Sequence, residues 1–312
     1  MLGRMGRDAS SLLGVEITPP FIRLVRLCRR RGLYHLQGWA LEPLPTGVMH
    51  QGWITEPEQV GVVLREAVLR CAGQGRRGAV ALPGGLVIEK VLSLPADLED
   101  HLMDERLSSD VGEFVPFALE EAAIDFQSVG PYPGNPLHQQ VVVAVCHLAL
   151  LDALQASAEC ADLFICAVEP DAHALRRAVQ VGGMQDALLL QLEVGALVIH
   201  ECAAGPVAQR REVPLYECQG SVPVVVAAVD NYLLSRPGRA LPAQVFLTGG
   251  GARDQSFAEQ LEQRLGIEVR HADPFQSVVP APGLDTLPSR DQAKYLAVAC
   301  GLAMREGDRC LN

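Results

Sequence analysis

The sequence of 312 residues lacks the patterns that mark several common classes of protein. Its nine cysteines form no C-x-x-C pair, which disfavours a zinc site or a disulfide framework and favours buried free thiols in a reducing compartment. No G-x-S-x-G, H-E-x-x-H or G-x-x-x-x-G-K-[ST] motif occurs, so no hydrolase or P-loop signature is present. The eight histidines are isolated from one another in sequence, which favours surface or core roles over metal ligation.

Long apolar runs and an excess of positive charge are also missing. The start of the chain has no apolar core long enough for a signal peptide. Asp152 and Glu193 interrupt the most apolar later stretches, which fall short of the roughly 20 residues of a transmembrane helix. The formal net charge of −11 disfavours a general nucleic-acid binder. We therefore predict a soluble, cytoplasmic chain whose membrane contact is indirect.

One basic cluster stands against this acidic background, formed by Arg26, Arg29, Arg30 and Arg31. A solvated strand end and turn is the favoured interpretation of these residues. Contact with anionic lipid or with a protein partner is the alternative.

The remaining composition, 49% hydrophobic and 20% charged, is that of an ordinary globular protein, and the length suits two lobes. Strands rich in Leu, Ile and Val are expected at 11–17, 21–28 and 32–42, followed by a helix over 56–72. The run "GAVALP" then reads as a buried strand. The first lobe therefore begins with three strands and a helix.

From residue 84 to residue 160 the character of the sequence changes. The order strand, acidic helix, strand, strand, helix predicts a small α+β insert, with the last helix over 149–160. A strand and a helix in "FICAVEPDAHALRRAVQ" then return to the first lobe. A second lobe follows with three strands, a helix, a strand ending in "TGGG", a further helix, and a closing helix in "RDQAKYLAVACGLAMR".

The two lobes repeat one another at their beginnings. Each opens with three strands and a helix, and the first strands end in "GVEIT" with Glu16 and "QLEVG" with Glu193. Such a repeat places the two acids across a cleft, which is the plan of the two-lobed actin-like ATPases. The predicted division is lobe 1 at 9–83 and 161–182, the insert at 84–160, and lobe 2 at 186–312.

Specific segments give this plan a family resemblance. "VPFALEEAAIDFQ" and the series "LTGGG", "ADPF" and "ACGLA" are the most specific, and the matching segments run in order from about residue 12 to residue 304. On these segments the chain resembles the PilM family, actin-like cytoplasmic proteins of the type IV pilus inner-membrane platform that are similar to FtsA. The resemblance implies an α/β, two-lobed actin-like (ribonuclease H-like) fold, with an FtsA/PilM-type insert in lobe 1.

The chain departs from the family pattern at the first hairpin, which typically reads close to G-I-D-I-G-S-S-S-V-K. Here Glu16 stands for the Asp, Thr18 for the Gly, and Arg23 for the Lys, while the turn "PPF" (19–21) replaces the hydroxyl-rich residues. The second hairpin, "LEVGA", again has Glu for Asp. The region between Gly205 and Leu247 is also shorter than in typical members, as in HofM-type relatives, which predicts a reduced lobe 2.

These departures bear on nucleotide binding. A phosphate-binding hairpin points backbone N–H groups at anionic oxygens, and proline has none. Losing two such bonds weakens binding by about 3–6 kcal/mol. We expect a vestigial nucleotide cleft without catalytic residues or a cofactor, and its residues are Glu16, Thr18, Glu193, Gly195, Gly249, Gly250 and Gly251. Binding of ATP and magnesium, with or without turnover, remains the alternative, since Glu16 and Glu193 can hold a hard cation through water.

The resemblance also implies a partner. In the family, a groove between the insert and lobe 1 binds the N-terminal cytoplasmic tail of PilN, a bitopic membrane protein. In "EFVPF", Phe114, Val115, Pro116 and Phe117 are predicted either to form the core under the insert or to line that groove. The function expected is a non-catalytic scaffold; an ATP-dependent switch and a sugar-kinase-like enzyme are the alternatives. The sequence does not distinguish among adhesive pili, motility and DNA uptake, and it does not determine self-association.

Overall fold

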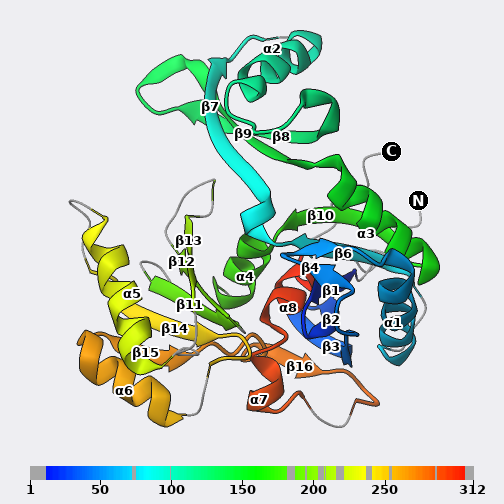
Figure 1. Cartoon of the computed structure of the whole chain (residues 1–312), viewed down its shortest axis with the longest axis vertical. Helices are drawn as coiled ribbons and strands as arrows, with labels where there is room; N and C mark the ends of the chain where they lie inside the picture. Colours follow the sequence, from blue (N-terminus) through cyan, green and yellow to red (C-terminus); the bar gives the residue numbers. More distant parts are fainter. Residues whose placement is uncertain are drawn as a thin grey trace, which may run out of the picture.

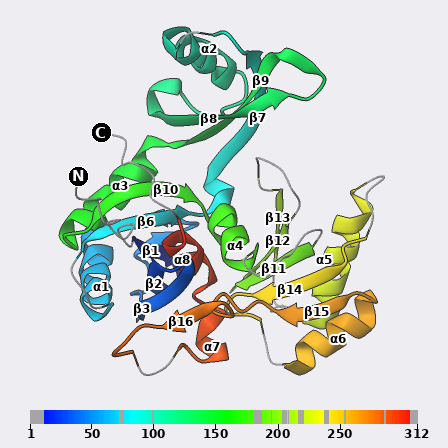
Figure 2. The ribbon, with the colours of Figure 1, turned by 180° about the vertical axis from the view of Figure 1, so that it is seen from behind.

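The computed structural model describes residues 12–71, 75–98, 100–180, 187–193, 195–202, 207, 209–215, 221–236, 241–252, 255–284 and 287–305. Two lobes lie side by side, and a smaller α+β unit stands off lobe 1 (Figures 1 and 2). Strands β7 and β9 connect that unit to lobe 1.

Lobe 1 is built on a six-stranded sheet in the order β10-β6-β1-β2-β3-β16. Its strands are β1 (Leu13–Thr18), β2 (Phe21–Arg30), β3 (Leu33–Pro43), β6 (Arg77–Leu82), β10 (Phe164–Pro170) and β16 (Val278–Pro280). The first three strands form an antiparallel meander, whereas β6 runs parallel to β1 and β10 parallel to β6. A two-stranded ribbon, β4 (Met49–His50) and β5 (Trp53–Ile54), follows β3.

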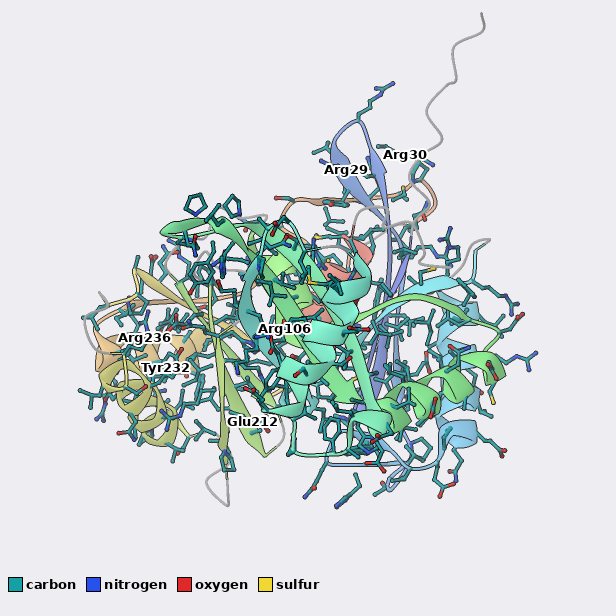
Figure 3. The ribbon with its side chains drawn as sticks, turned by 90° about the horizontal axis from the view of Figure 1, so that it is seen from above. Arg29, Arg30, Arg106, Glu212, Tyr232 and Arg236 are labelled. Atoms are coloured by element: carbon teal, nitrogen blue, oxygen red, sulfur yellow. The ribbon has the colours of Figure 1, made fainter. Side chains whose placement is uncertain are left out.

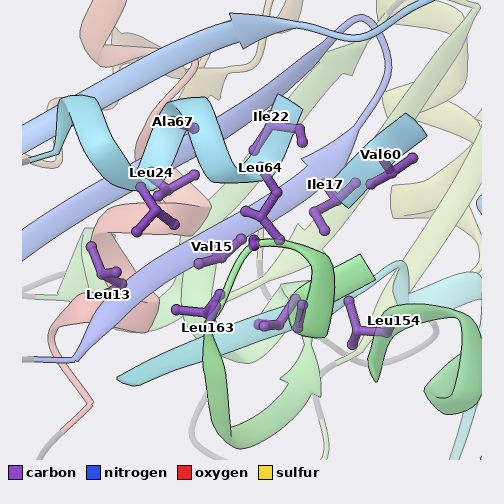
Figure 4. Packing of buried hydrophobic residues seen from close by; sticks show 14 of the residues in the cluster. Leu13, Val15, Ile17, Ile22, Leu24, Val60, Leu64, Ala67, Leu154 and Leu163 are labelled. Atoms are coloured by element: carbon purple, nitrogen blue, oxygen red, sulfur yellow. The ribbon is translucent and has the colours of Figure 1, made fainter. Parts of the chain in front are cut away.

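Helices cover both faces of this sheet, which explains why β1 is buried on both sides. One face packs against α1 (Pro57–Arg70) and α3 (Leu148–Cys160), and the other against α4 (Asp171–Gln180) and α8 (Ala297–Ala303). Figure 4 shows Leu13, Val15 and Ile17 of β1 meeting the side chains of α1 and α3. On the opposite face α8 approaches so closely that a Cβ on Gly14 would lie 1.8 Å from the Ala299 carbonyl oxygen.

Helix α3 packs on lobe 1, although the sequence placed it at the end of the insert. Leu150 and Leu154 belong to the core of lobe 1. A Cβ on Gly61 of α1 would lie 2.4 Å from the Cβ of Cys160, so the two helices are in close contact. The part of the 84–160 unit that stands apart therefore ends where β9 ends.

That unit is a three-stranded antiparallel sheet in the order β7-β9-β8, with one helix on it. Its elements are β7 (Val87–Pro95), α2 (Asp100–Gly112), β8 (Ala122–Tyr132) and β9 (Asn135–His147). It has its own core, in which Leu107 and Val111 of α2 pack on Val141 and Val143 of β9. The predicted strand and helix order of the insert is thus present.

Lobe 2 repeats the sheet of lobe 1. Its order is β13-β12-β11-β14-β15, which matches β3-β2-β1-β6-β10 strand for strand. The strands are β11 (Ala187–Glu193), β12 (Ala196–Glu201), β13 (Arg210–Pro214), β14 (Gln244–Thr248) and β15 (Glu268–His271). Helices α5 (Val222–Leu234) and α6 (Gln255–Leu265) cover one face. On the other face, Leu189 and Phe246 meet α4 and α8, so these two helices lie between the lobes.

The end of the chain differs from the sequence-based division in two ways. Strand β16 pairs with β3, and α8 packs on β1 and β2, so part of the range 186–312 returns to lobe 1. The closing helix is also broken into α7 (Arg290–Ala293) and α8, with Lys294 and Tyr295 in the interruption. The exact limits of the lobes otherwise stay a prediction.

Candidate functional site

The first hairpin turns at Pro19 and Pro20 and pairs Glu16 directly with Arg23. Arg23 Nη1 donates to Glu16 Oε1 at 3.1 Å and to the carbonyl oxygen of Thr18 at 3.1 Å. Both side chains are buried, with 1% of Arg23 and 6% of Glu16 exposed. The buried acid of this hairpin is therefore paired with a cation of the same hairpin.

Glu193 of lobe 2 lies close to the same cation. Arg23 Nη2 is 3.8 Å from Glu193 Oε2, so one guanidinium stands between the two predicted acids. Burial raises the pKa of Glu16 to about 7; Arg23 acts in the opposite direction, and Glu193 and Asp171 add to the rise. The structure thus brings Glu16 and Glu193 together across the cleft, with a protein cation shared between them.

A polar chain continues from Glu193 into lobe 2. Gln191 Nε2 donates to Glu193 Oε1 at 3.3 Å, and Gln191 Oε1 lies 3.1 Å from His200 Nε2. Burial, and then Arg210, lower the pKa of His200 to about 3, so this imidazole is neutral at ordinary pH. Gly195 has a positive φ of 84° at the following turn, and its carbonyl accepts from Leu215 N at 2.8 Å. The predicted residues of the second hairpin are therefore engaged with the protein itself.

The glycine turn after β14 is engaged in the same way. Gly249 N and Thr248 Oγ1 both donate to the carbonyl oxygen of Lys294 at 3.2 Å, and Gly251 N donates to the carbonyl oxygen of Leu192 at 2.8 Å. Gly249 has φ +86°, a conformation that favours glycine.

Tyr295, which the sequence did not indicate, occupies the middle of the cleft. Its ring makes an edge contact with Phe21 at a centroid distance of 5.8 Å and lies 5.9 Å from the Arg23 guanidinium. A Cβ on Gly250 would lie 2.4 Å from the same ring, so a larger residue there would displace the tyrosine side chain. The break between α7 and α8 is what directs this side chain into the cleft.

The space left among these residues is small. A cavity of about 10 Å³ is lined by Glu16, Glu193, Gly249 and Tyr295 among others. That volume suits about one water molecule. Pockets for small ligands and cofactors have volumes of roughly 300–1,000 Å³. Among the described residues there is also no group of three or more His, Cys, Asp or Glu side chains placed to hold a metal ion.

The residues predicted for the partner groove lie in the insert's core region. Phe114, Val115 and Phe117 pack against the core of the insert, whereas Pro116 is exposed. Lys90 Nζ lies 4.3 Å from the Phe114 ring centroid, and the rings of Phe117 and His147 are 5.2 Å apart. These four residues are absent from the lining of the groove described next.

A groove of about 560 Å³ separates the insert from lobe 1. Consecutive residues 123–127 of β8 line one side, and consecutive residues 166–170 of β10 line the other. Since side chains alternate between the faces of a strand, lining by consecutive residues means that the groove runs along strand edges. Both strands are indeed at the edges of their sheets. Which strands lie at a sheet edge depends on the order of all the strands in that sheet, and the local sequence pattern does not predict this order.

The groove is lined by both apolar and charged side chains. Ala123, Ile124, Cys146 and Leu151 contribute apolar surface, and Phe126 is 40% exposed at its rim.

The charged group in the groove is Glu169 with its two arginines. Arg177 binds its carboxylate at 2.8 and 3.0 Å, and Arg305 binds it at 2.6 Å. Arg177 also donates to the carbonyl oxygen of Gly301 at 2.7 Å. This network joins β10, α4 and the α8 region, and so fixes one wall of the groove.

The described helices include none that is long and apolar enough to cross a membrane. The fold itself is shared with solved structures. The PilM–PilN type IV pilus biogenesis complex contains a chain that matches with a TM-score of 0.78 and 18% identity, over 95% of this chain and 98% of that one. The ethanolamine utilization protein EutJ from Carboxydothermus hydrogenoformans gives 0.51 and 13%, over 97% and 92%.

A Bacteroides thetaiotaomicron protein described as having an actin-like ATPase fold gives a TM-score of 0.51 at 8% identity, over 96% of this chain and 97% of that one. At these identities the likeness establishes the fold, which is the two-lobed actin-like architecture. A family profile described as "Type IV pilus assembly protein PilM" matches residues 14–199 and 219–307. The chain therefore belongs to the PilM family of type IV pilus assembly proteins.

Proposed function

We propose that this protein is a non-catalytic scaffold at the cytoplasmic face of the inner membrane, in a type IV pilus or DNA-uptake platform. In this proposal the groove between β8 and β10 binds the N-terminal tail of a PilN-like bitopic membrane protein. The observation that carries the proposal is the groove itself, which is open along two strand edges and needs no cofactor. A solved relative is a complex of PilM with PilN.

The chemistry of the groove suits an extended peptide. An edge strand presents unpaired backbone N–H and C=O groups, to which a further strand adds by main-chain hydrogen bonds. Side chains of that added strand alternate, so every second one meets the apolar surface near Ile124 and Phe126. The charged group around Glu169 offers a polar contact in the groove.

The absence of catalysis is proposed from the state of the cleft. Arg23 spans the two acids, and Tyr295 leaves a cavity of about 10 Å³ between them. A nucleotide therefore requires the lobes to separate and Tyr295 to move. The alternative, an ATP-dependent switch, is supported by the facing positions of Glu16 and Glu193, which nucleotide and magnesium could bridge after such an opening.

The test is calorimetric titration of the purified protein, first with ATP and magnesium and then with a peptide copying the tail of a PilN-like protein encoded beside it. We expect a saturable isotherm with the peptide and no binding heat with millimolar ATP. Tight ATP binding would contradict the scaffold proposal and favour the ATP-dependent switch. Absence of peptide binding under conditions where the protein is folded would contradict the assignment of the groove.

Two variants on the same strand make the peptide test specific. Phe126→Ser removes apolar surface at the rim, while Val129→Ser changes a side chain that is 41% exposed but lies outside the groove lining. Covering the exposed part of a phenylalanine, about 80 Å², contributes about 2 kcal/mol. Phe126→Ser is therefore expected to weaken peptide binding by up to about thirtyfold. An equal effect of Val129→Ser would show that the peptide binds elsewhere.

A further inference from the structure

The hairpin that joins β2 to β3 projects from lobe 1, with Arg29 and Arg30 at its end (Figure 3). Arg29, Arg30 and Arg31 are all exposed. Arg26, the fourth member of the basic cluster in the sequence, is instead buried and donates to the carbonyl oxygen of Gly75 at 2.7 Å. The exposed cluster is therefore confined to the tip.

Strand register places apolar side chains beside this basic tip. Arg30 pairs with Leu33, and Val279 of β16 pairs with His35. Directly paired residues share a face of the sheet, as do residues two apart on one strand. Arg30, Leu33, His35 and Val279 consequently lie on one face, and with Arg31 in the turn they form what we call the hairpin face. Leu33 is 53% exposed and Val279 is 41% exposed.

The two chain segments that form this region contain no acidic residues, although the whole chain has 37 of them and a net charge of −11. Neither residues 27–41, which include the hairpin tip, nor residues 274–284, which include β16, contain an Asp or Glu. No acid in these two segments therefore offsets the positive charge of the tip, while the net negative charge of the whole protein repels it from an anionic surface. An approach through this tip is therefore more favourable than one through an acidic part of the surface.

We propose that the hairpin face binds anionic lipid headgroups at a membrane surface directly. This goes beyond the proposed function, in which the membrane is reached only through a partner's tail. Arginines near an anionic leaflet each favour binding by about fivefold, and exposed aliphatic side chains enter the boundary between headgroups and acyl chains.

A lipid surface explains the shape and the chemistry of the tip better than a polymer does. A nucleic acid requires an extended basic surface for its phosphates, and Leu33 and Val279 offer nothing to it. A projecting hairpin with aliphatic side chains beside arginines suits a soft, planar anionic layer. Two or three arginines bind an anionic membrane only weakly by themselves. The contact of the hairpin face with lipid therefore acts together with the binding of the PilN-like tail, and it orients the protein on the membrane.

The test is flotation of the full chain with vesicles of phosphatidylcholine, and with vesicles in which part of the lipid is phosphatidylglycerol, at low ionic strength. We expect binding only to the anionic vesicles, and loss of that binding in high salt. The double substitution Arg30→Ser and Arg31→Asn is expected to lower the partition coefficient about twenty-five-fold. Asparagine is chosen because Arg31 has φ +52°.

The matched control is Arg65→Ser with Arg264→Ser, which removes the same charge from exposed positions on α1 and α6. Leu33→Ser is compared with Leu234→Ser, an exposed leucine of α5. Equal losses in the control pair, or equal binding to neutral vesicles, would overturn the proposal. Binding of polyglutamate or DNA at the tip, without vesicle binding, would replace the lipid by an acidic polymer.

Discussion

Replacing Arg23 by methionine tests whether the cleft is held by its own ion pair. Arg23→Met keeps the apolar stem but removes the cation from between Glu16 and Glu193. It also leaves the Thr18 carbonyl without the hydrogen bond that Arg23 donates. The variant is expected to fold with lower stability, and its loss of stability is expected to depend on pH.

The size of the loss follows from the protonation of Glu16. Its folded pKa of about 7 exceeds the ordinary value of 4.5, so the folded protein holds a proton there that the unfolded chain releases between these values. At about pH 5 Glu16 is protonated with or without Arg23, and the loss is that of hydrogen bonds, about 1 kcal/mol. Above pH 7 only the variant keeps the proton, because the attraction of Arg23 is gone. Each further pH unit then lowers the stability of the variant relative to the wild type by about 1.4 kcal/mol, so the loss near pH 8 is about 2–3 kcal/mol.

Urea unfolding followed by tryptophan fluorescence measures this loss, since both tryptophans, Trp39 and Trp53, are in lobe 1. In the double variant with Glu16→Gln, the extra slope above pH 7 is expected to vanish. Arg106→Gln, which breaks an exposed pair with Asp110, is expected to change stability by less than about 0.5 kcal/mol. A loss for Arg23→Met that stays constant from acid to alkaline pH would refute the raised pKa of Glu16.

Three further predictions concern the packing of the two lobes. Gly14→Ala should lower the free energy of unfolding, measured in urea, by about 3 kcal/mol, because the new Cβ meets the Ala299 carbonyl. In the control Gly112→Ala the new Cβ makes only an ordinary contact, so the change should stay within about 0.5 kcal/mol. Similar effects of the two substitutions would contradict the close β1–α8 packing. The pKa of His200 is lowered from 6.5 to about 3, so below pH 6.5 the unfolded chain takes up a proton that the folded protein does not. His200 should therefore lower the stability of the wild type by about 1.4 kcal/mol for each pH unit below 6.5, and His200→Gln should remove this contribution. A pH profile of stability that His200→Gln leaves unchanged would contradict the lowered pKa. Among the seven described cysteines, exposed Cys160 should be alkylated first and Cys71, whose pKa burial raises to about 12, much later, as mass spectrometry of the labelled peptides would show; equal rates would be evidence against this packing.

The hairpins and their acids could be predicted from the sequence because their determinants are local. A two-residue turn at Pro19 and Pro20 sets the register, so the strands on either side must pair Glu16 with Arg23. That register alone is enough to bring an acid and a cation together on one face of the hairpin. Runs of Leu, Ile and Val then marked the strands of both lobes, and the repeated acid linked the lobes to one another.

The remaining features depend on contacts between distant parts of the chain. Strand β16 pairs with β3 across more than two hundred residues of sequence, and no local pattern records that pairing. Tyr295 lies in a segment whose apolar periodicity suits one continuous helix, and tertiary packing breaks it into α7 and α8. The groove depends on which strands end up at sheet edges, so "EFVPF", although conspicuous, belongs to the insert's packing.

The closed cleft and the open groove are connected through β10 and the residue after it. Asp171 follows β10, accepts a hydrogen bond from Gly84 N at the beginning of the insert at 3.0 Å, and faces Arg210 of lobe 2. Burial raises the pKa of this carboxyl, while Arg210 and two backbone N–H groups act against the rise. Lobe 2, the base of the insert and the end of strand β10 therefore meet at the half-buried side chain of Asp171. Arg23, Tyr295 and Asp171 each make contacts between the lobes or beside them, and under the proposed function these contacts hold the groove in the shape that accepts the peptide.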